Sequence, residues 1–270
     1  MKFKQIVPGL SAMVVAAAFS LPAHAGLVVL DGIQIDTNGN LTTNIGRINL
    51  VSGNSTVHQE VNGSNNVFVG ARFVEDGQIF SISYTTENTV GPLDSGAPGI
   101  FTDGLTLRFN NVAGHVDQLL SGGGFHFVFT SGVYSISSAS GATVTGSIVG
   151  VDGTSSSSST VSGATGATTL LGTVLPGLGL FDFRDSTGAS LAAELAAGTV
   201  LFEATTNNQT TAASSFGACS FDATANCATA TTASAGDSYL VRRVPEPGTL
   251  AIVGLALGIL GFVGRRRKQG

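Results

Sequence analysis

The sequence has few of the side chains on which several common chemistries depend. Among its 270 residues there is no tryptophan, and lysine is absent from position 5 to position 267. A segment without lysine holds neither a P-loop nor a lysine that forms a Schiff base. Sugar-binding surfaces generally use exposed tryptophan and tyrosine side chains. The body of the chain offers only three tyrosines for that purpose: Tyr84, Tyr134 and Tyr239.

Charged residues are also scarce, at 11% of the chain, and they are unevenly placed. Between positions 26 and 246, six arginines stand against all 17 acidic residues, which gives this part a net charge of −11. A surface of this sign repels nucleic acid and anionic membranes. We therefore expect no nucleic-acid partner.

The N-terminus is typical of a secretory signal peptide. Basic residues come first, an apolar stretch follows, and small residues come after it. This order predicts removal of residues 1–25 by cleavage between Ala25 and Gly26, so that the mature chain folds outside the cytoplasm. An N-terminal membrane anchor that is never cleaved is the alternative.

Only two cysteines occur, Cys219 and Cys227, with seven residues between them. In an oxidising compartment, a lone pair so close in sequence favours a disulfide that closes a small loop. A metal site would need two more ligands at suitable spacing, and a redox motif has only two residues between its cysteines. The sequence therefore predicts the disulfide over both alternatives.

The C-terminus combines a proline-containing motif, an apolar run and a basic cluster, in that order. They are Val244, Pro245, Glu246 and Pro247; the uncharged run Leu250 to Val263; and Arg265, Arg266, Arg267 and Lys268. With its flanking residues, the run reaches the lower limit for a transmembrane helix. The basic cluster predicts that its C-terminal end stays in the cytoplasm. A plain tail anchor, in which the prolines stiffen the approach to the membrane, has the same topology.

The same three features resemble the PEP-CTERM sorting signal recognised by exosortase, a membrane transpeptidase of biofilm-forming Gram-negative bacteria. The resemblance implies exosortase as the processing partner, with cleavage near Pro245 to Pro247. It also implies that the tail is only transiently inserted in the inner membrane, and that the body is then extracellular or on the outer cell surface. The expected divisions are a signal peptide, 1–25, an extracellular body, 26–242, and a sorting signal, 243–270.

The body is dominated by alternation of apolar and polar residues. Stretches of this kind, which predict strands, lie at 67–74, 78–84, 105–109 and 125–129. Dipeptides that favour turns recur between and beside them: Asp76-Gly77, Asp103-Gly104, Ser131-Gly132 and Asp152-Gly153. The pattern predicts an all-β fold, namely an antiparallel β-sandwich or a jelly-roll-like body.

Two segments of the body depart from this alternation. Residues 191–197 are the one good helix candidate, and they are too few to change the fold class. The segment 135–169 is rich in serine and threonine and includes five consecutive serines. We expect it to be a loop within one domain, with a hinge between two half-domains as the alternative.

The body has no recognisable catalytic set. It lacks the G-x-S-x-G nucleophile elbow. Acidic pairs such as Glu75 with Asp76 and Asp182 with Asp185 are the residue type that glycosidases use, although aspartate is also common in turns. The three histidines of the body are expected to be solvated: His58, His115 and His126. We therefore predict no catalytic residues and no enzyme activity.

Calcium is the one cofactor for which the sequence offers a partial motif. Residues 36–40 begin like an EF-hand loop, but Leu41 replaces the required glycine and Arg47 replaces the glutamate at the twelfth position. An EF-hand is therefore excluded. A calcium site built from several loops, for example from Asp94, Asp103 and Asp152, stays open, and the sequence does not locate it. No other metal or cofactor is expected.

Two classes of function remain. The first is a matrix protein that promotes flocculation or biofilm cohesion by associating with exopolysaccharide or another surface component. The second is a carbohydrate-binding module or a polysaccharide-active enzyme that carries the same tail. The segment 30–60 and the following 71–84 are also similar to the opening of flocculation-associated PEP-CTERM proteins. This second resemblance implies a role in cell aggregation and carries no catalytic residue across.

Overall fold

The computed structural model describes residues 26–87, 96–121, 123–155, 165–175 and 181–244. Nearly all of these residues form β-strands, and the predicted helix at 191–197 is present as one short helix, α2. The elements are β1 (Gly26–Val29), β2 (Ile33–Thr37), β3 (Asn40–Val61), β4 (Arg72–Thr86), β5 (Pro98–Ile100), β6 (Leu105–Leu119), β7 (Phe125–Ser138), β8 (Thr143–Ser155), β9 (Thr165–Val174), β10 (Phe181–Arg184), α2 (Ala192–Ala196), β11 (Val200–Cys219) and β12 (Asp222–Val244).

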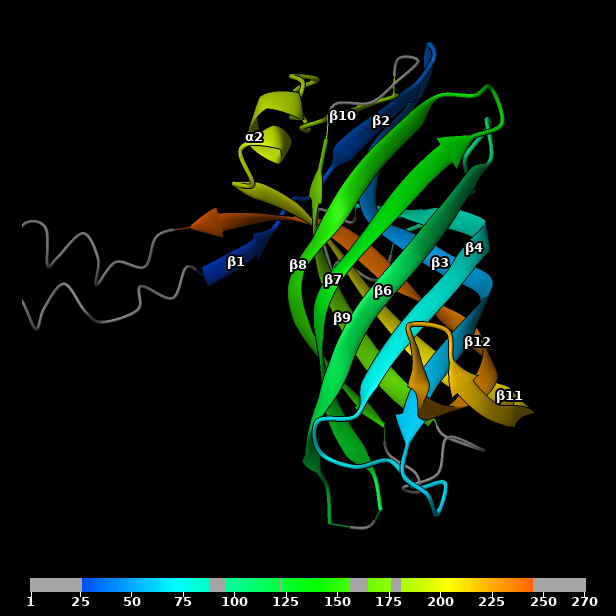
Figure 1. Cartoon of the computed structure of the whole chain (residues 1–270). Helices are drawn as coiled ribbons and strands as arrows, with labels where there is room; N and C mark the ends of the chain where they lie inside the picture. The colour runs from blue at the N-terminus through cyan, green and yellow to red at the C-terminus, as the bar shows by residue number, and fades with distance from the viewer. Residues whose placement is uncertain (1–25, 88–95, 122, 156–164, 176–180, 245–270) are drawn as a thin grey trace, which may run out of the picture. The chain divides into compact units, whose positions relative to one another are not determined.

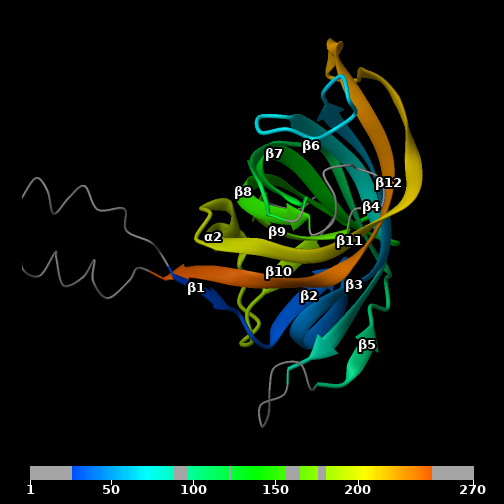
Figure 2. The same cartoon turned by 90° about the horizontal axis from the view of Figure 1, so that it is seen from below.

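The larger compact unit is Val29–Arg242, and its strands belong to one sheet (Figure 1). Hydrogen-bonded neighbours follow the order β12, β11, β9, β8, β7, β6, β4, β3, and β3 pairs again with β12. The eight long strands therefore form a closed ring in which neighbouring strands run antiparallel. Figure 2 shows β3, β4, β6, β7, β8, β9, β11 and β12 around a common interior.

The predicted all-β, antiparallel class is confirmed, but the predicted β-sandwich or jelly-roll arrangement is wrong. The described strands form one sheet whose last strand pairs with its first long strand, not two sheets packed face to face. Alternation shows which side of each strand is apolar. It does not show whether the facing apolar surface is a second sheet or the far wall of the same one.

The hairpin between β2 and β3 is formed by residues suited to a tight turn. Thr37 pairs with Asn40, and the two residues between them, Asn38 and Gly39, have φ angles of 56° and 89°. Two consecutive residues with positive φ define the two-residue turn that Asn-Gly favours. Asp36 accepts a hydrogen bond from the Gly39 backbone at 2.8 Å. The segment that resembled the start of a calcium loop is therefore a hairpin turn.

One end of the interior is covered by the strands and helix outside the ring. Three residues of these elements are at most 3% exposed: Ile35 of β2, Phe183 of β10 and Leu195 of α2. They belong to the main apolar cluster, which also contains Leu50 and Leu240 from the ring. These apolar side chains give β2, β10 and α2 a reason to pack across this end.

The other end is filled from the segment between β3 and β4. Val67 and Ala71 are buried with Val116, Phe125 and other residues in a second apolar cluster. The predicted strand at 67–74 is therefore correct only from Arg72 onward. The alternation predicts a strand throughout 67–74. Val67 instead lies in a loop and packs against the interior.

Three of the four predicted turns lie inside strands. Asp76-Gly77 is in β4, Ser131-Gly132 is in β7 and Asp152-Gly153 is in β8, while only Asp103-Gly104 forms a turn. The strands at 78–84, 105–109 and 125–129 are confirmed as parts of β4, β6 and β7. They are longer than predicted, and in β4, β7 and β8 the strand continues through the turn-favouring dipeptide beside an irregularity in its pairing.

The segment 135–169 was predicted to be a loop, and most of it is strand. It contributes the end of β7, all of β8 and the start of β9, and only 156–164 lies outside the described residues. Val144 and Ile148 of β8 face the interior, while Thr145 and Ser147 between them are exposed. Thr145 and Ser147 thus occupy outward positions of a regular strand.

Candidate functional site

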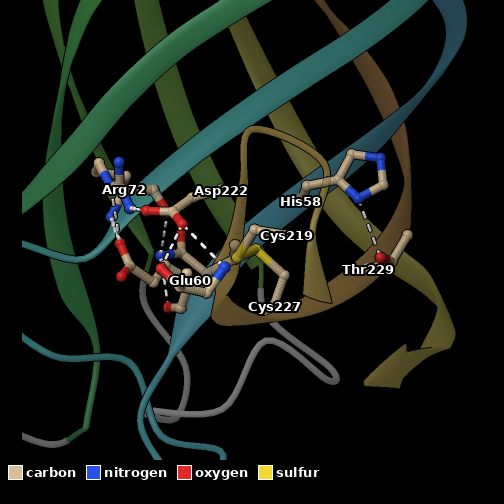
Figure 3. Close-up of a disulfide and its surroundings, with 9 residues drawn as sticks. His58, Glu60, Arg72, Cys219, Asp222, Cys227 and Thr229 are labelled. Atoms are coloured by element: carbon tan, nitrogen blue, oxygen red, sulfur yellow. Dashed lines mark hydrogen bonds and ion pairs between the residues drawn. A yellow bond between two sulfur atoms is a disulfide. The ribbon is translucent and has the colours of Figure 1, made fainter. Parts of the chain in front are cut away.

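The tip of the β11–β12 hairpin carries the disulfide. Cys219 ends β11, Cys227 lies in β12, and their sulfur atoms are bonded (Figure 3). Both cysteines are buried, and their Cα atoms are 4.8 Å apart. The bond joins two strands that already pair, so it closes the last turn of the hairpin.

An arginine connects this hairpin to the strands beside it. Arg72, at the start of β4, contacts Glu60 of β3 at 3.1 Å and Asp222 of the hairpin at 2.6 Å. Its guanidinium also lies 5.2 Å from the ring centre of Phe221. Hydrogen bonds from Thr224 and Arg72 hold the pKa of Asp222 well below its usual value. Figure 3 shows this cluster beside the disulfide.

The three histidines do not come together. His58 lies 3.0 Å from the Thr229 hydroxyl, across the β3–β12 pair. His126 lies 2.5 Å from Asp117, and this contact lowers the pKa of the aspartate. His115 is on β6, opposite Arg72 of β4. Each histidine is thus placed beside a different partner, and the three do not form a catalytic set.

The acidic pairs singled out in the sequence are also separated by the structure. Glu75 faces the interior of the sheet, whereas its neighbour Asp76 faces outward and accepts a hydrogen bond from the Asn111 backbone at 2.7 Å. Asp182 contacts Arg184 at 3.1 Å. Asp185 binds the hydroxyl and backbone of the following turn, which lowers its pKa.

The candidate calcium ligands do not converge in the described part of the chain. Asp103 binds Ser140 through both the backbone and the hydroxyl, and the bond to the Ser140 hydroxyl is the main reason that its pKa is lowered. Asp152 belongs to strand β8, and Asp94 lies outside the described residues. Among the residues that the structure describes, no group of three or more His, Cys, Asp or Glu is suited to hold a metal ion.

A band of polar side chains crosses the interior of the closed sheet, and sequence analysis missed it. On β12, buried Ser234 and Thr232 lie between buried Leu240 and Ala230. Ser55 of β3 is 2.5 Å from the Thr232 hydroxyl and also binds the Glu75 carboxylate. We name this set the polar band; its members are Ser55, Glu75, Thr168, Thr206, Asn208, Thr232 and Ser234.

A signal for the polar band was present in the sequence. Glu75 is separated from Phe73 by two positions and from Ile79 by four, so all three share one face of β4. Both apolar residues are buried. A carboxylate that is an even number of positions from buried residues of the same strand is expected to point inward. Treating Glu75 and Asp76 as one acidic pair left this position of Glu75 unnoticed.

The described part of β12 ends at Val244, and Pro245 to Gly270 lie outside the described residues. The predicted signal peptide, 1–25, also lies outside them. Within the described residues, no helix has the length and apolar character needed to cross a membrane. The predicted transmembrane run, Leu250 to Val263, lies outside the described residues.

Comparison with protein families identifies the C-terminal segment. The model of the PEP-CTERM protein-sorting motif matches residues 243–268. The chain carries a PEP-CTERM sorting motif. The match includes the Pro-Glu-Pro, the apolar run and the basic cluster, so the resemblance noted in the sequence is confirmed.

The PEP-CTERM motif is a substrate signal for exosortase, and it implies export with a tail that is only transiently in the membrane. The match covers the tail and does not extend into the body. No curated protein matches this PEP-CTERM chain, and no solved structure matches it. The function of the body must therefore be argued from its own residues.

Proposed function

We propose that the chain is an exported, non-enzymatic protein of the cell surface or extracellular matrix that promotes flocculation or biofilm cohesion by associating with exopolysaccharide. The observation that carries this proposal is the sorting motif at 243–268. A removable sorting tail is useful only for a protein whose place of action lies beyond the inner membrane.

The arrangement of polar groups in the body supports a non-catalytic role. Arg184 contacts Asp36 at 2.7 Å and Asp182 at 3.1 Å, so both carboxylates take part in one ion network. A catalytic acid and base need to face a common reacting atom. In the two acidic pairs, each carboxylate binds a backbone, hydroxyl or guanidinium group instead.

The charge of the body bears on how cohesion would work. A net charge of −11 between residues 26 and 246 makes copies of the chain repel one another. Cohesion therefore requires screening salt or a bridging divalent cation such as calcium. We expect flocs to loosen when a chelator is added and to recover when calcium is restored.

The test is deletion of the gene in its own host. We expect flocs to disperse while exopolysaccharide synthesis continues, as measured by settling and by total polysaccharide. The full chain should restore flocculation, whereas a chain that ends at Val244 should be exported and fail to restore it. Normal flocculation in the deletion strain would contradict the proposal.

The second candidate is a sugar-binding module or polysaccharide-active enzyme with the same tail. The observation in its favour is a carboxylic acid, Glu75, that borders an internal cavity. This candidate predicts that Glu75→Gln or Asp182→Asn abolishes a measurable cleavage of polysaccharide while the protein stays folded. We expect no such cleavage in the wild-type protein.

A further inference from the structure

Five members of the polar band line a cavity of about 50 Å³ inside the sheet. A space of this size accommodates roughly four water-sized groups, at about 10–15 Å³ each. The polar wall is formed by Glu75, Thr168, Thr206, Asn208 and Ser234, from β4, β9, β11 and β12. Most of the remaining lining is apolar and includes aromatic rings.

One polar atom in this wall has no partner. The Asn208 amide nitrogen donates a hydrogen bond to the Thr168 hydroxyl at 3.1 Å. Its Oδ1 atom is buried and is the one buried side-chain polar atom without a hydrogen-bond partner among the described residues. Because a buried acceptor without a donor is costly, the cavity favours an occupant that carries a hydroxyl or another donor.

The charges around the cavity favour a neutral occupant. Among the described residues that line it, Glu75 is the only acidic residue, and none is lysine, arginine or histidine. Ser55 donates a hydrogen bond to one of the Glu75 carboxyl oxygens. Burial raises the pKa of Glu75, this hydrogen bond opposes the shift, and the charge of Asp76 adds to it. The described lining therefore offers no cationic group to hold an anion.

The rest of the lining offers apolar surface for carbon atoms. It includes Phe109, Phe129 and Tyr134. The Tyr134 hydroxyl is already used, because it donates to the Thr173 carbonyl at 2.9 Å. The Tyr134 ring stacks on Phe202 with ring centres 5.5 Å apart. An occupant therefore meets both hydrogen-bonding groups and aromatic rings.

An open groove lies beside the same residues. Its volume is about 590 Å³, and Asn208 and Ser234 line both this groove and the cavity.

We propose that this cavity binds one small neutral polyol of two or three carbons, with its hydroxyl groups on the Asn208 wall and its carbons against Phe109 and Phe129. The volume excludes a saccharide chain, so this site is separate from the proposed association with exopolysaccharide and does not depend on it. Size, the unpartnered acceptor and the mixed polar and aromatic lining all point to this class of ligand.

The test is titration of the purified full-length chain with ethylene glycol and glycerol, followed by NMR. We expect saturable shifts and nuclear Overhauser contacts between ¹³C-labelled glycerol and the Phe129 ring. Asn208→Leu should weaken binding about tenfold, the effect of one lost hydrogen bond. The matched control is Asn54→Leu, because Asn54 of β3 is exposed and lines neither the cavity nor the groove, and this variant should bind as wild type does.

Several results would overturn the proposal. One is a cavity that holds only ordered water and gives no saturable response to either polyol. Another is tighter binding of protonated ethanolamine than of ethylene glycol, because that would assign the site to a cation. Equal loss in both variants would place the binding elsewhere. The contacts to Phe129 are measured on the wild-type chain, so the test stands even if Asn208→Leu does not fold.

Discussion

Glu75 carries a carboxyl group on the inner face of the sheet, whereas its neighbour Asp76 faces outward. The Glu75 carboxyl group lies among Ser55, Thr232 and apolar side chains on the inner face of the sheet. Burial is the main cause of its raised pKa, the negative charge of Asp76 adds to it, and the Ser55 hydrogen bond opposes it. The folded chain therefore holds a proton at Glu75 at pH values where the unfolded chain releases it.

This difference makes stability depend on pH. Because the folded pKa lies above the usual value of 4.5, the contribution of Glu75 to stability is fully present below pH 4.5 and is lost as the pH rises through the folded pKa. Glu75→Gln keeps the shape and stays neutral. We expect the variant to match wild type near pH 4 and to exceed it in free energy of unfolding at pH 8. Urea denaturation of both proteins across this range measures the effect, and parallel pH profiles would contradict it.

Two interior glycines make room for Tyr134. A Cβ atom on Gly146 would lie 2.4 Å from the Tyr134 ring and 2.0 Å from the Thr173 carbonyl oxygen, and one on Gly172 would lie 2.4 Å from the same ring. The ring thus packs directly on the backbone of β8 and β9. Without a side chain at these positions, the hydroxyl of Tyr134 can reach its backbone partner in β9.

Gly146→Ala should therefore destabilise the fold by roughly 1–3 kcal/mol, the usual cost of overpacking a filled interior. The matched control is Gly217→Ala. Gly217 is also a strand glycine, its φ is not in the left-handed region, and nothing lies within 4 Å of an added Cβ. The control should be as stable as wild type or slightly more stable. Chemical denaturation checks both variants, and equal losses would show that the Tyr134 contact is not the cause.

At the scale of elements, the β11–β12 hairpin extends past the point where β9 stops pairing with β11. Beyond that point β11 keeps only β12 as a described partner, while β12 is also paired with β3. The disulfide and the Arg72 contacts lie on this part of the hairpin (Figure 3). The Arg72 contacts join this part of the hairpin to β3 and β4.

Replacement of both cysteines by serine should lower the free energy of unfolding by about 2–3 kcal/mol, as expected for a disulfide that closes so short a loop. Reducing agent should cause a similar loss in the wild-type chain and none in the double variant. Thiol titration of the unfolded, non-reduced secreted protein should find no free thiol at Cys219 or Cys227. Two free thiols would show that the bond does not form in the native compartment.

At the scale of the whole molecule, processing decides which residues the mature protein contains. The predicted signal peptide, 1–25, and the sorting motif, 243–268, flank the compact unit Val29–Arg242. Both are addresses used during export. We therefore expect the mature body to lack the lysines and the C-terminal basic cluster.

Mass spectrometry of the protein from its own host should show Gly26 as the first residue and no sorting tail beyond the Pro-Glu-Pro region. A tag placed after Gly270 should be absent from the surface-exposed protein and present on the inner-membrane precursor. Replacing Pro245 and Pro247 by alanine should leave the precursor uncleaved. Recovery of intact Arg265 to Lys268 on the cell surface would contradict processing and favour a plain tail anchor.

The sequence by itself determined the class of structure and the sorting address. Alternation at 78–84, 105–109 and 125–129 located three strands, and the order of proline motif, apolar run and basic cluster located the motif at 243–268. Both are local patterns. Strand alternation depends on residues two apart, and the sorting motif is a continuous segment that needs no folded partner to be read.

Only the tertiary structure decided that the sheet closes, because the β3–β12 pairing joins segments from opposite ends of the body. It also decided that Asp76-Gly77 continues a strand, since the neighbours that supply its hydrogen bonds are distant in sequence. Glu75 and Asn208 meet at one cavity for the same reason. Turn propensity and charge are properties of single residues, whereas an inward position and an unpartnered acceptor exist only once the ring of strands has formed around them.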